Sequence, residues 1–415
     1  MARRRAAGRR ALRQRQRRRG RNRAHAGSRG GRRRREEDRL MARIAFVQCQ
    51  VSQLDEPVYS RMYELDPHSV AVVYWNDYGF ARQRIDPEIG IVPDLGEPGG
   101  RDYPKVWIDR SMAGAHRDIL AAVLQFKPEI AVLSDQPQLA RLRLAFALRR
   151  RGVRVVFRVD KNQLSERPRR GFALALERQV ARGAFDALAP TSPLTSAYYA
   201  WPAARESVLF PYATNERKFA PPPEVRARKR AETRARGAIA PDAFVFVSAT
   251  KFSSRESPWE LVESYARIAD IGNIHLLALG DGPLLPEIKR ECARRGLDRV
   301  TFPGFVPFRD LQDYFFAADA YLHLVAVGPW EVSPQDALVA GLGLVTTETV
   351  GSASVFLRGA LRRFLVPFGD RALSAARMRE LAFDPNSAAW FEPARLATGD
   401  YTVDATARRW LEAFK

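Results

Sequence analysis

Residues 244–283 read FVFVSATKFSSRESPWELVESYARIADIGNIHLLALGDGP, and this stretch decides the fold class. An apolar run at 244–252 predicts a buried strand that breaks into a polar loop at Ser253. Apolar residues at helical spacing follow, with Pro258 near the first turn, where a helix tolerates proline. A second apolar run, 274–283, ends in a Gly-Asp-Gly-Pro turn. Strand, helix and strand in this order predict an α/β unit with a parallel sheet.

The same alternation runs through both halves of the chain. We expect two doubly wound, Rossmann-like α/β domains facing each other across a cleft. The triple proline that begins at Pro221 is typical of an interdomain linker, and a charged, solvent-exposed helix is expected at 224–237. The predicted parts are an N-terminal domain at 41–220, a linker at 221–240, a C-terminal domain at 241–398 and a closing helix at 399–415.

The basic charge of the chain is concentrated at one end. Residues 1–40 hold 18 Arg and three acidic residues, so they account for +15 of the net charge of +21. This segment has too few large apolar residues to fold alone. It is either an arm for nucleic acid or anionic lipid, or a stretch upstream of a true start at Met41; we favour the second interpretation. A secretory signal is excluded because no apolar segment follows the arginines.

Several function classes lack their motifs. The chain has no G-x-G-x-x-G after its first strand, no P-loop, no H-E-x-x-H and no G-x-S-x-G. Cys49 and Cys292 stand alone, which argues against a structural zinc or a disulfide scaffold and suits a reducing compartment. His275 and His323 lie in apolar strands, where satisfied core residues are expected. No apolar run approaches the length of a membrane span, and we predict no metal and no cofactor.

Polar residues cluster where the predicted strands end. In parallel sheets these ends line the crevice that binds ligands. In the first half they are Asp135, Arg158 and Asp160, which we assign to the binding of an acceptor substrate. In the second half two cations, a helix N-terminus and an acidic residue suit a nucleoside diphosphate, with Arg binding phosphate bidentately and Lys as a point charge. These donor-side residues are Lys251, Arg255, Gly282, Phe305, Glu331, Val332, Ser333 and Asp336.

The order of these segments resembles glycosyltransferase family 4, the retaining GT-B enzymes. The resemblance covers nearly all of 43–415 and rests on spacing and order. The similar segments are SATKFSSRESP (248–258), LGDGP (279–283), VTFPGFV (300–306), AADAYLHLV (317–325), DALVAGL (336–342), FRVD (157–160) and LFPYATNERKF (209–219).

The resemblance implies transfer of a sugar from a nucleoside diphosphate sugar to an acceptor hydroxyl, with retention and without a metal. Lys251 and Arg255 would stabilise the leaving diphosphate, and Asp336 would hold the ribose. The chain departs from the family's pattern where Glu-Pro-Trp-Gly becomes Gly-Pro-Trp-Glu at 328–331. The family's sugar-contacting glutamate is therefore Gly328 here, and Glu331 substitutes for it only if the turn is rebuilt. In a second departure, Glu256 stands at the position where the family has its second basic residue.

Three hypotheses follow. The favoured one is a cytoplasmic glycosyltransferase, at the inner membrane face if its acceptor is lipid-borne, that makes a polysaccharide, glycolipid or natural-product glycan. The second is a GT-B protein that binds nucleotide or glycan without turnover, motivated by Gly328. The third is a nucleic-acid-binding protein, motivated by the arginine arm; nucleic acid is the least favoured partner.

Overall fold

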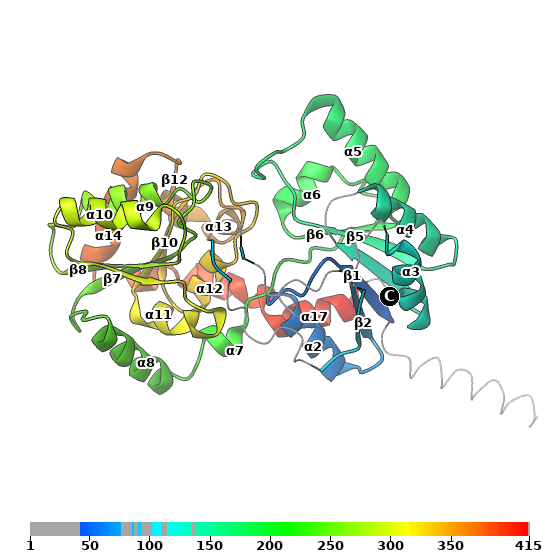
Figure 1. Ribbon diagram of the computed structural model, residues 1–415, viewed down its shortest axis with the longest axis horizontal. Helices are drawn as coiled ribbons and strands as arrows, with labels where there is room; N and C mark the ends of the chain where they lie inside the picture. The colour runs from blue at the N-terminus through cyan, green and yellow to red at the C-terminus, as the bar shows by residue number, and fades with distance from the viewer. Residues whose placement is uncertain are drawn as a thin grey trace, which may run out of the picture. The chain divides into compact units, whose positions relative to one another are not determined.

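The computed structural model describes residues 42–75, 85–86, 90–92, 102–108, 114–134 and 138–413, and these residues build two parallel six-stranded sheets (Figure 1). Each sheet is flanked by helices, and together they form two Rossmann-like α/β domains, as the sequence predicts. The arginine-rich residues 1–40 and Asp135 lie outside the described residues.

The N-terminal sheet has the strand order β3-β2-β1-β4-β5-β6. Its strands are β1 (Ile44–Gln48), β2 (Val70–Tyr74), β3 (Lys105–Trp107), β4 (Ile130–Ser134), β5 (Arg154–Val159) and β6 (Ala187–Pro190). The helices that follow them are α2 (Glu56–Leu65), α3 (His116–Gln125), α4 (Leu139–Arg149), α5 (Gly171–Ala184) and α6 (Pro193–Tyr199).

The central strands of this sheet are apolar on both faces because both faces are covered. In β1, Ala45 and Val47 belong to the cluster of buried residues that α3 to α6 also supply. The alternate residue Phe46 points to the other face, where its ring lies 4.5 Å from the ring of Tyr59 on α2. Such two-sided burial explains the uninterrupted apolar runs in the sequence.

The C-terminal sheet has the strand order β12-β11-β10-β7-β8-β9. Its strands are β7 (Phe244–Ala249), β8 (Ile274–Leu279), β9 (Val300–Gly304), β10 (Ala320–His323), β11 (Gly343–Thr347) and β12 (Leu365–Val366). Its helices are α9 (Pro258–Ala266), α10 (Leu285–Arg294), α11 (Leu311–Ala317), α12 (Ser333–Val339), α13 (Gly351–Phe356), α14 (Arg371–Phe383), α15 (Ser387–Trp390) and α16 (Glu392–Ala397). Short 3-10 turns span Phe308–Asp310, Gly359–Phe364 and Thr398–Tyr401.

Two helices lie between the sheets in the sequence. They are α7 (Glu216–Phe219) and α8 (Pro223–Arg236), the second of which lies where the linker was predicted. Helix α8 is charged and mostly exposed, as expected, but Arg234 is buried and donates hydrogen bonds to the Ala317 carbonyl and to Asp319. These bonds attach α8 to the end of α11.

The last helix, α17 (Val403–Glu412), returns to the N-terminal sheet (Figure 1). It packs against α2, and the indole of Trp410 lies 5.0 Å from the ring of Phe46 and stacks at 3.5 Å on Phe210. Helix α17 therefore contributes Trp410 to the hydrophobic core of the N-terminal sheet. In the described part of the chain, no helix is both long enough and apolar enough to cross a membrane.

Candidate active site

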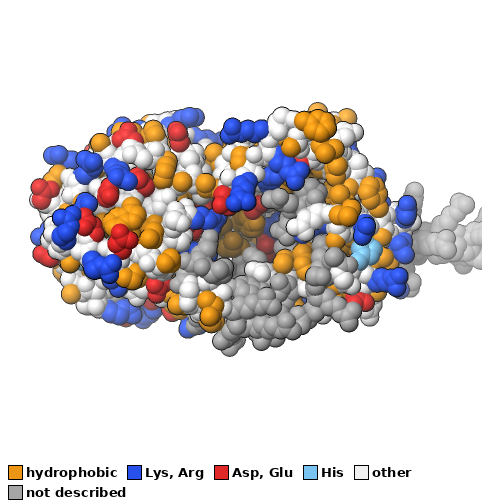
Figure 2. Space-filling model, turned by 45° about the horizontal axis from the view of Figure 1, so that its top comes forward, with side chains coloured by type: hydrophobic (Ala, Val, Ile, Leu, Met, Phe, Trp, Pro, Cys, Tyr) orange, Lys and Arg blue, Asp and Glu red, His pale blue; other side chains and the backbone are white. Residues whose placement is uncertain are grey.

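A cavity of about 440 Å³ opens at the carboxyl ends of β7, β8, β9 and β10. Loops at these ends are positioned by a rigid sheet, which is why open α/β sheets bind ligands there. Figure 2 shows the surface hollowed between the parts of the chain that carry the two sheets. The cavity lining includes Gln50, Gln53, Asp86, Thr250, Lys251, Glu256, Asp281, Phe305, Val306, Phe308, Leu311, His323, Glu331 and Ser333.

The loop after β7 carries the predicted cations. The ammonium of Lys251 lies 3.1 Å from the carboxylate of Asp86, a partner that the sequence did not reveal. Glu256 accepts hydrogen bonds from the Thr250 hydroxyl at 2.9 Å and from the Lys251 backbone at 3.2 Å, so it fixes the loop that presents the lysine. Arg255 lies 3.9 Å from Glu256 and does not belong to the cavity lining.

The Gly-Asp-Gly turn after β8 lies directly on the β7 loop. A side chain at Gly280 would collide with the Thr250 carbonyl oxygen, and one at Gly282 would lie 2.6 Å from the Phe252 carbonyl oxygen. Both glycines have positive φ, 128° and 153°. Gly282 is therefore required for close packing of two loops. Asp281 and Gly280 line the cavity, as does Phe305 at the end of β9, whereas Gly282 does not.

The turn 328–333 forms another wall. Glu331 and Ser333 line the cavity, and Val332 precedes α12 at its N-terminus without lining it. The Glu331 side chain is 31% exposed, and its Oε2 lies 3.8 Å from Nε2 of His323. Burial, reinforced by the negative charge of Glu256, raises the pKa of Glu331 to about 7.

Two histidines behave differently. His275 is the satisfied core residue that the sequence predicts, with its ring nitrogen 2.8 Å from the Thr301 hydroxyl. For His323 that expectation is wrong: it lines the cavity, and neither ring nitrogen has a hydrogen-bond partner among the described residues. Burial lowers the pKa of His323 to about 4, so the ring is neutral at pH 7.

The structure places Asp336, the predicted ribose contact, in the first turn of α12. Its carboxyl is buried near Thr214 and the ammonium of Lys218, and it does not line the cavity. Burial raises the pKa of Asp336 to about 7 against the lowering effects of these two neighbours. Lys218 in turn lies 3.3 Å from the ring centre of Phe308, a lining residue. Helix α7, which carries Lys218, packs against α12, which carries Asp336.

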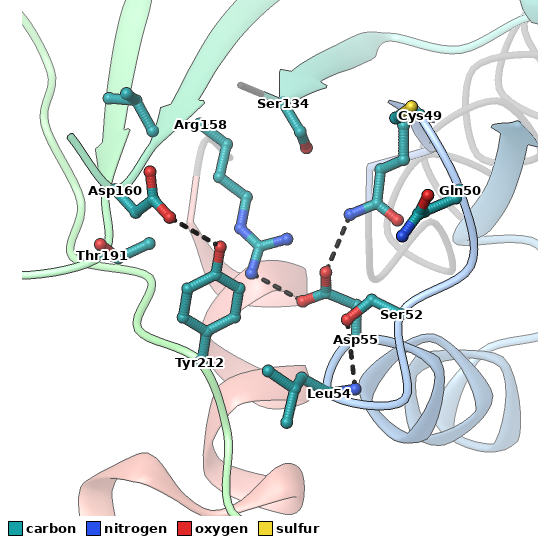
Figure 3. Close-up of a pocket in the computed structure, with 12 residues that line it drawn as sticks. Cys49, Gln50, Ser52, Leu54, Asp55, Ser134, Arg158, Asp160, Thr191 and Tyr212 are labelled. Carbon is teal, nitrogen blue, oxygen red and sulfur yellow. Dashed lines mark hydrogen bonds and ion pairs between the residues drawn. The ribbon is translucent and has the colours of Figure 1, made fainter. Parts of the chain in front are cut away.

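A second pocket, of about 270 Å³, lies at the carboxyl ends of β1, β4 and β5 in the N-terminal sheet (Figure 3). It brings together Arg158 and Asp160, both predicted for the acceptor. Arg158 donates to Asp55 at 2.7 Å, and both side chains are less than 10% exposed. Tyr212 donates to Asp160 at 3.2 Å, and Figure 3 shows these two pairs on adjacent sides of the pocket.

Several buried polar atoms in this pocket lack partners among the described residues. They are Oε1 of Gln48, Oγ of Ser134, Nε of Arg158 and Oγ1 of Thr191. Each of these side chains is more than 90% buried. Buried polar atoms are normally hydrogen-bonded, so these donors and acceptors are available to ordered water or to a polar ligand in this pocket. The sequence pointed to Arg158, but its partner Asp55 lies 103 residues away and gave no signal.

A larger hollow of about 620 Å³ lies at the opposite edge of the C-terminal sheet, where β10 and β11 begin. Ligands of open α/β sheets bind outside the carboxyl ends of the strands, and this hollow lies at the other end. Among the described residues, no group of three or more His, Cys, Asp or Glu side chains is arranged to hold a metal ion.

Two Rossmann-like domains with ligand pockets at their strand ends define the GT-B fold class. Residues 229–395 match the family model described as glycosyl transferases group 1. A search of curated proteins found no relative of this chain.

Solved structures share the fold at low identity. Anabaena Alr3699/HepE in complex with UDP and glucose is 14% identical, with a TM-score of 0.66, and the match covers 89% of this chain and 98% of that one. Sucrose-phosphate synthase from Thermosynechococcus elongatus is 18% identical, with a TM-score of 0.63 and coverage of 89% and 97%. A glycosyltransferase from Rickettsia africae is 11% identical, with a TM-score of 0.69 and coverage of 90% and 97%. These likenesses establish the GT-B fold.

Proposed function

We propose that this chain is a glycosyltransferase that moves a sugar from a nucleoside diphosphate sugar to an acceptor hydroxyl with retention of configuration. The products would be polysaccharides, glycolipids or natural-product glycans. The observation that carries the proposal is the polar cavity with Lys251 at the strand ends of the domain that matches the glycosyl transferase model. Fold relatives that bind UDP, UDP-glucose and UDP-2-fluoro glucose support a nucleotide sugar as donor.

In this proposal Lys251 binds the diphosphate. Its present partner, Asp86, is a carboxylate, and phosphate oxygens offer the same hydrogen-bond acceptors with more charge. Binding would thus exchange one anionic partner for another. As the bond to the sugar breaks, negative charge grows on the diphosphate, and a fixed cation there lowers the barrier. Arg255 is 43% exposed and close enough in sequence to add a second cation when ligand is bound.

The nucleoside would lie against Phe305, Val306, Phe308 and Leu311, the apolar side of the cavity. Ser333 offers a hydroxyl near the diphosphate. A ribose contact by Asp336 stays a prediction. In this proposal Lys218, which acts electrostatically on Asp336 and lies 3.3 Å from the ring centre of Phe308, moves or takes over the contact.

The acceptor would occupy the N-terminal pocket. Arg158 donates from an unpartnered Nε, and Ser134 and Thr191 add hydroxyls, a mixture that suits the hydroxyls of a sugar. Asp160 also lines this pocket, and Asp135 follows β4 outside the described residues. Asp55 and Asp160 outnumber the single Arg158 in the lining, so the pocket favours a neutral acceptor group over an anionic one.

The proposal includes no metal, no cofactor and no protein general base. Charge stabilisation is assigned to Lys251 and Arg255, and the departing phosphate is assigned the acceptor proton. Closing the cleft around the reactants would exclude water from the sugar. Retention is tested by nuclear magnetic resonance of the product's anomeric proton. An inverted product would overturn this part of the proposal alone.

Calorimetric titration with UDP, GDP and ADP tests the nucleotide site. We expect one of the three to bind with a micromolar to low millimolar Kd. Absence of binding by all three at millimolar concentration would overturn the proposal.

The second candidate is a protein of the same fold that binds nucleotide or glycan without turnover, which Gly328 favours because this position has no side chain to reach a sugar. Turnover of any nucleotide sugar, even slow hydrolysis, excludes it. Nucleic-acid binding through residues 1–40 is a third candidate, and unchanged DNA and RNA retention after their deletion rejects it.

A face of α5 supports peripheral membrane association. Phe172 is 83% exposed and Leu176, one turn later, is 50% exposed. Arg167, Arg169 and Arg170 immediately precede them and are exposed. Figure 2 shows hydrophobic side chains gathered over the part of the molecule that carries α5. An apolar strip beside cations fits an anionic lipid surface.

Co-sedimentation tests this association. The chain should bind vesicles that contain phosphatidylglycerol and not vesicles of phosphatidylcholine. The variant F172S/L176S should lose this binding. If it binds as well as the unchanged chain, this face is not the contact.

A further inference from the structure

The backbone at Glu331 is strained. Its φ is +59°, in the left-handed region that side chains other than glycine and asparagine rarely adopt. Four other described non-glycine residues share such a φ, namely Lys127, Ala200, Ala238 and Ser257. Lys127, Ala200 and Ala238 lie at the C-terminal ends of helices, where left-handed residues are common, and Ser257 is the N-cap of α9; none of the four lines the cavity. Glu331 alone among these five combines the strain with a place in the cavity wall.

The side chain of Glu331 fills the space above Gly328. A Cβ atom at Gly328 would lie 2.8 Å from Cγ of Glu331 and 3.5 Å from its Oε1. The two positions therefore compete for one volume. A glycine at 328 leaves this volume empty, and the left-handed turn lets the carboxylate from three residues later enter it.

The surrounding structure holds the turn in this shape. The Gly328 carbonyl accepts from the Gly351 amide at 2.8 Å, and the Trp330 carbonyl accepts from the Ser352 amide at 2.8 Å. The Pro329 carbonyl accepts from the Asn162 side chain at 2.8 Å. Trp330 is buried, stacked on Tyr401. Strain that is over-determined in this way is a recognised feature of functional sites.

The carboxylate faces the cavity with open acceptor sites. The ring of His323, which its burial keeps neutral at pH 7, lies 3.8 Å from this carboxylate, and no described residue donates a hydrogen bond to it. Glu331 lines the cavity together with Lys251, and the neighbouring Pro329 carbonyl accepts from Asn162, two residues after Asp160 of the N-terminal pocket. A carboxyl group here repels phosphate and accepts hydrogen bonds from hydroxyls. In a transferase, the sugar in transit lies between these two pockets.

We propose that Glu331 contacts the hydroxyls of the transferred sugar, and that it does so through a left-handed turn that places its side chain in the space left by Gly328. The inference rests on the proposed function and makes Glu331 a specificity-determining residue of the donor site. It also removes the reason for regarding the chain as inactive, because the carboxylate absent at 328 is supplied from 331.

Four variants test it: E331G, G328E, the exchange variant G328E/E331G, and E348Q as a control that removes an exposed carboxylate after β11. The binding probe is whichever of UDP, GDP or ADP binds the unchanged chain. The hydrolysis substrate is the corresponding nucleoside diphosphate glucose. E331G should fold and bind the nucleoside diphosphate within about twofold of the unchanged chain, while hydrolysis of the sugar nucleotide falls by about 100-fold, the effect of losing a hydroxyl-recognising group. G328E should lower the melting temperature because two side chains then compete for one volume.

The exchange variant should recover activity to within about tenfold of the unchanged chain, since it supplies the carboxylate to the same space. E348Q should match the unchanged chain in every assay. Undiminished hydrolysis by E331G, or an exchange variant that folds and is as inactive as E331G, would overturn the inference while leaving the proposed function intact. Failure of the unchanged chain to bind any nucleoside diphosphate would instead overturn the proposed function and the inference with it.

Discussion

The ammonium of Lys251, after β7, and the carboxylate of Asp86, in the N-terminal half of the chain, lie 3.1 Å apart in the wall of the cavity at the carboxyl ends of β7 to β10. The lysine is 36% exposed and the aspartate 18% exposed, so the pair is accessible to a ligand. An anionic ligand and Asp86 would compete for the same cation. If the cavity binds a diphosphate, a substitution of either Lys251 or Asp86 should change its affinity.

Replacing Lys251 with Ala should weaken binding of the nucleoside diphosphate by about 10- to 100-fold, the range expected for a charge-assisted hydrogen bond. Asp86→Asn should have the opposite effect and tighten binding about threefold, because the competing anion is gone. Both are measured by calorimetry at 0.15 M salt. Lys289→Ala, an exposed lysine on α10, serves as the control. Equal affinities for K251A and K289A would contradict the assignment of Lys251.

The buried pair Arg158–Asp55 should be essential for stability and for acceptor use. Asp55→Ala leaves a buried guanidinium unpaired and should cost about 3–5 kcal/mol of unfolding free energy. The double variant D55L/R158L should recover most of that loss, since apolar pairs often replace buried ion pairs without penalty. Urea denaturation measures both. If the double variant regains stability and still transfers sugar normally, the pocket does not bind the acceptor.

Deprotonation of Asp336 should lower the free energy of unfolding as the pH rises. Its pKa is about 7 in the folded chain and 3.8 as an isolated group, so the folded state binds more protons between these values. Stability from this group is therefore greatest below about pH 4 and is lost as pH rises through about 7. His275 and His323, both with a pKa lowered to about 4, act in the opposite direction between about pH 4 and 6.5.

The variant D336N isolates this contribution. The difference in unfolding free energy between D336N and the unchanged chain should be small at pH 4 and should favour D336N at pH 8. The measurement is urea denaturation at half-unit pH steps. A pH-independent difference would show that Asp336 titrates normally, and weaker nucleotide binding by D336N would support a ribose contact.

The closing helix should stabilise the N-terminal sheet. Trp410 contacts Phe46 on β1 and stacks on Phe210, so Trp410→Ala should cost about 3–5 kcal/mol. Hydrogen exchange should report the loss in β1 and β2 rather than in the C-terminal sheet. Arg408→Ala, on the exposed side of α17, is the matched control. Uniform loss of protection in both sheets would contradict this local role.

The fold class was predictable because each strand and helix has a recognisable pattern of apolar residues in its own segment of sequence. Strands such as β1 and β8 are buried on both faces, so each is a continuous apolar run that ends at a polar loop. The return of α17 to the first sheet was not predictable, since the amphipathic pattern around Trp410 shows that one face is buried but not against which partner. β3 was missed because it has only three residues, two of them exposed.

A place in a pocket was predictable for residues that directly follow strands. Lys251, Phe305 and Arg158 lie in their pockets for this reason. Asp336 lies on a helix, where the neighbouring segment around Thr214 and Lys218 decides which way the carboxyl points. Glu331 reaches the space above Gly328 only through a positive φ, which residue types do not reveal for a glutamate. Asp86 and Asp55 are distant in sequence from the cations they contact.

The central claim is transfer from a nucleoside diphosphate sugar, and the most direct measurement is release of nucleoside diphosphate by the full chain. It would be incubated with UDP-glucose, UDP-galactose, GDP-mannose and ADP-glucose, with and without a mixed sugar acceptor pool, with K251A in parallel. The account predicts release from at least one donor, faster with acceptor and at least about tenfold slower in K251A. No release above the K251A level from any donor would contradict it.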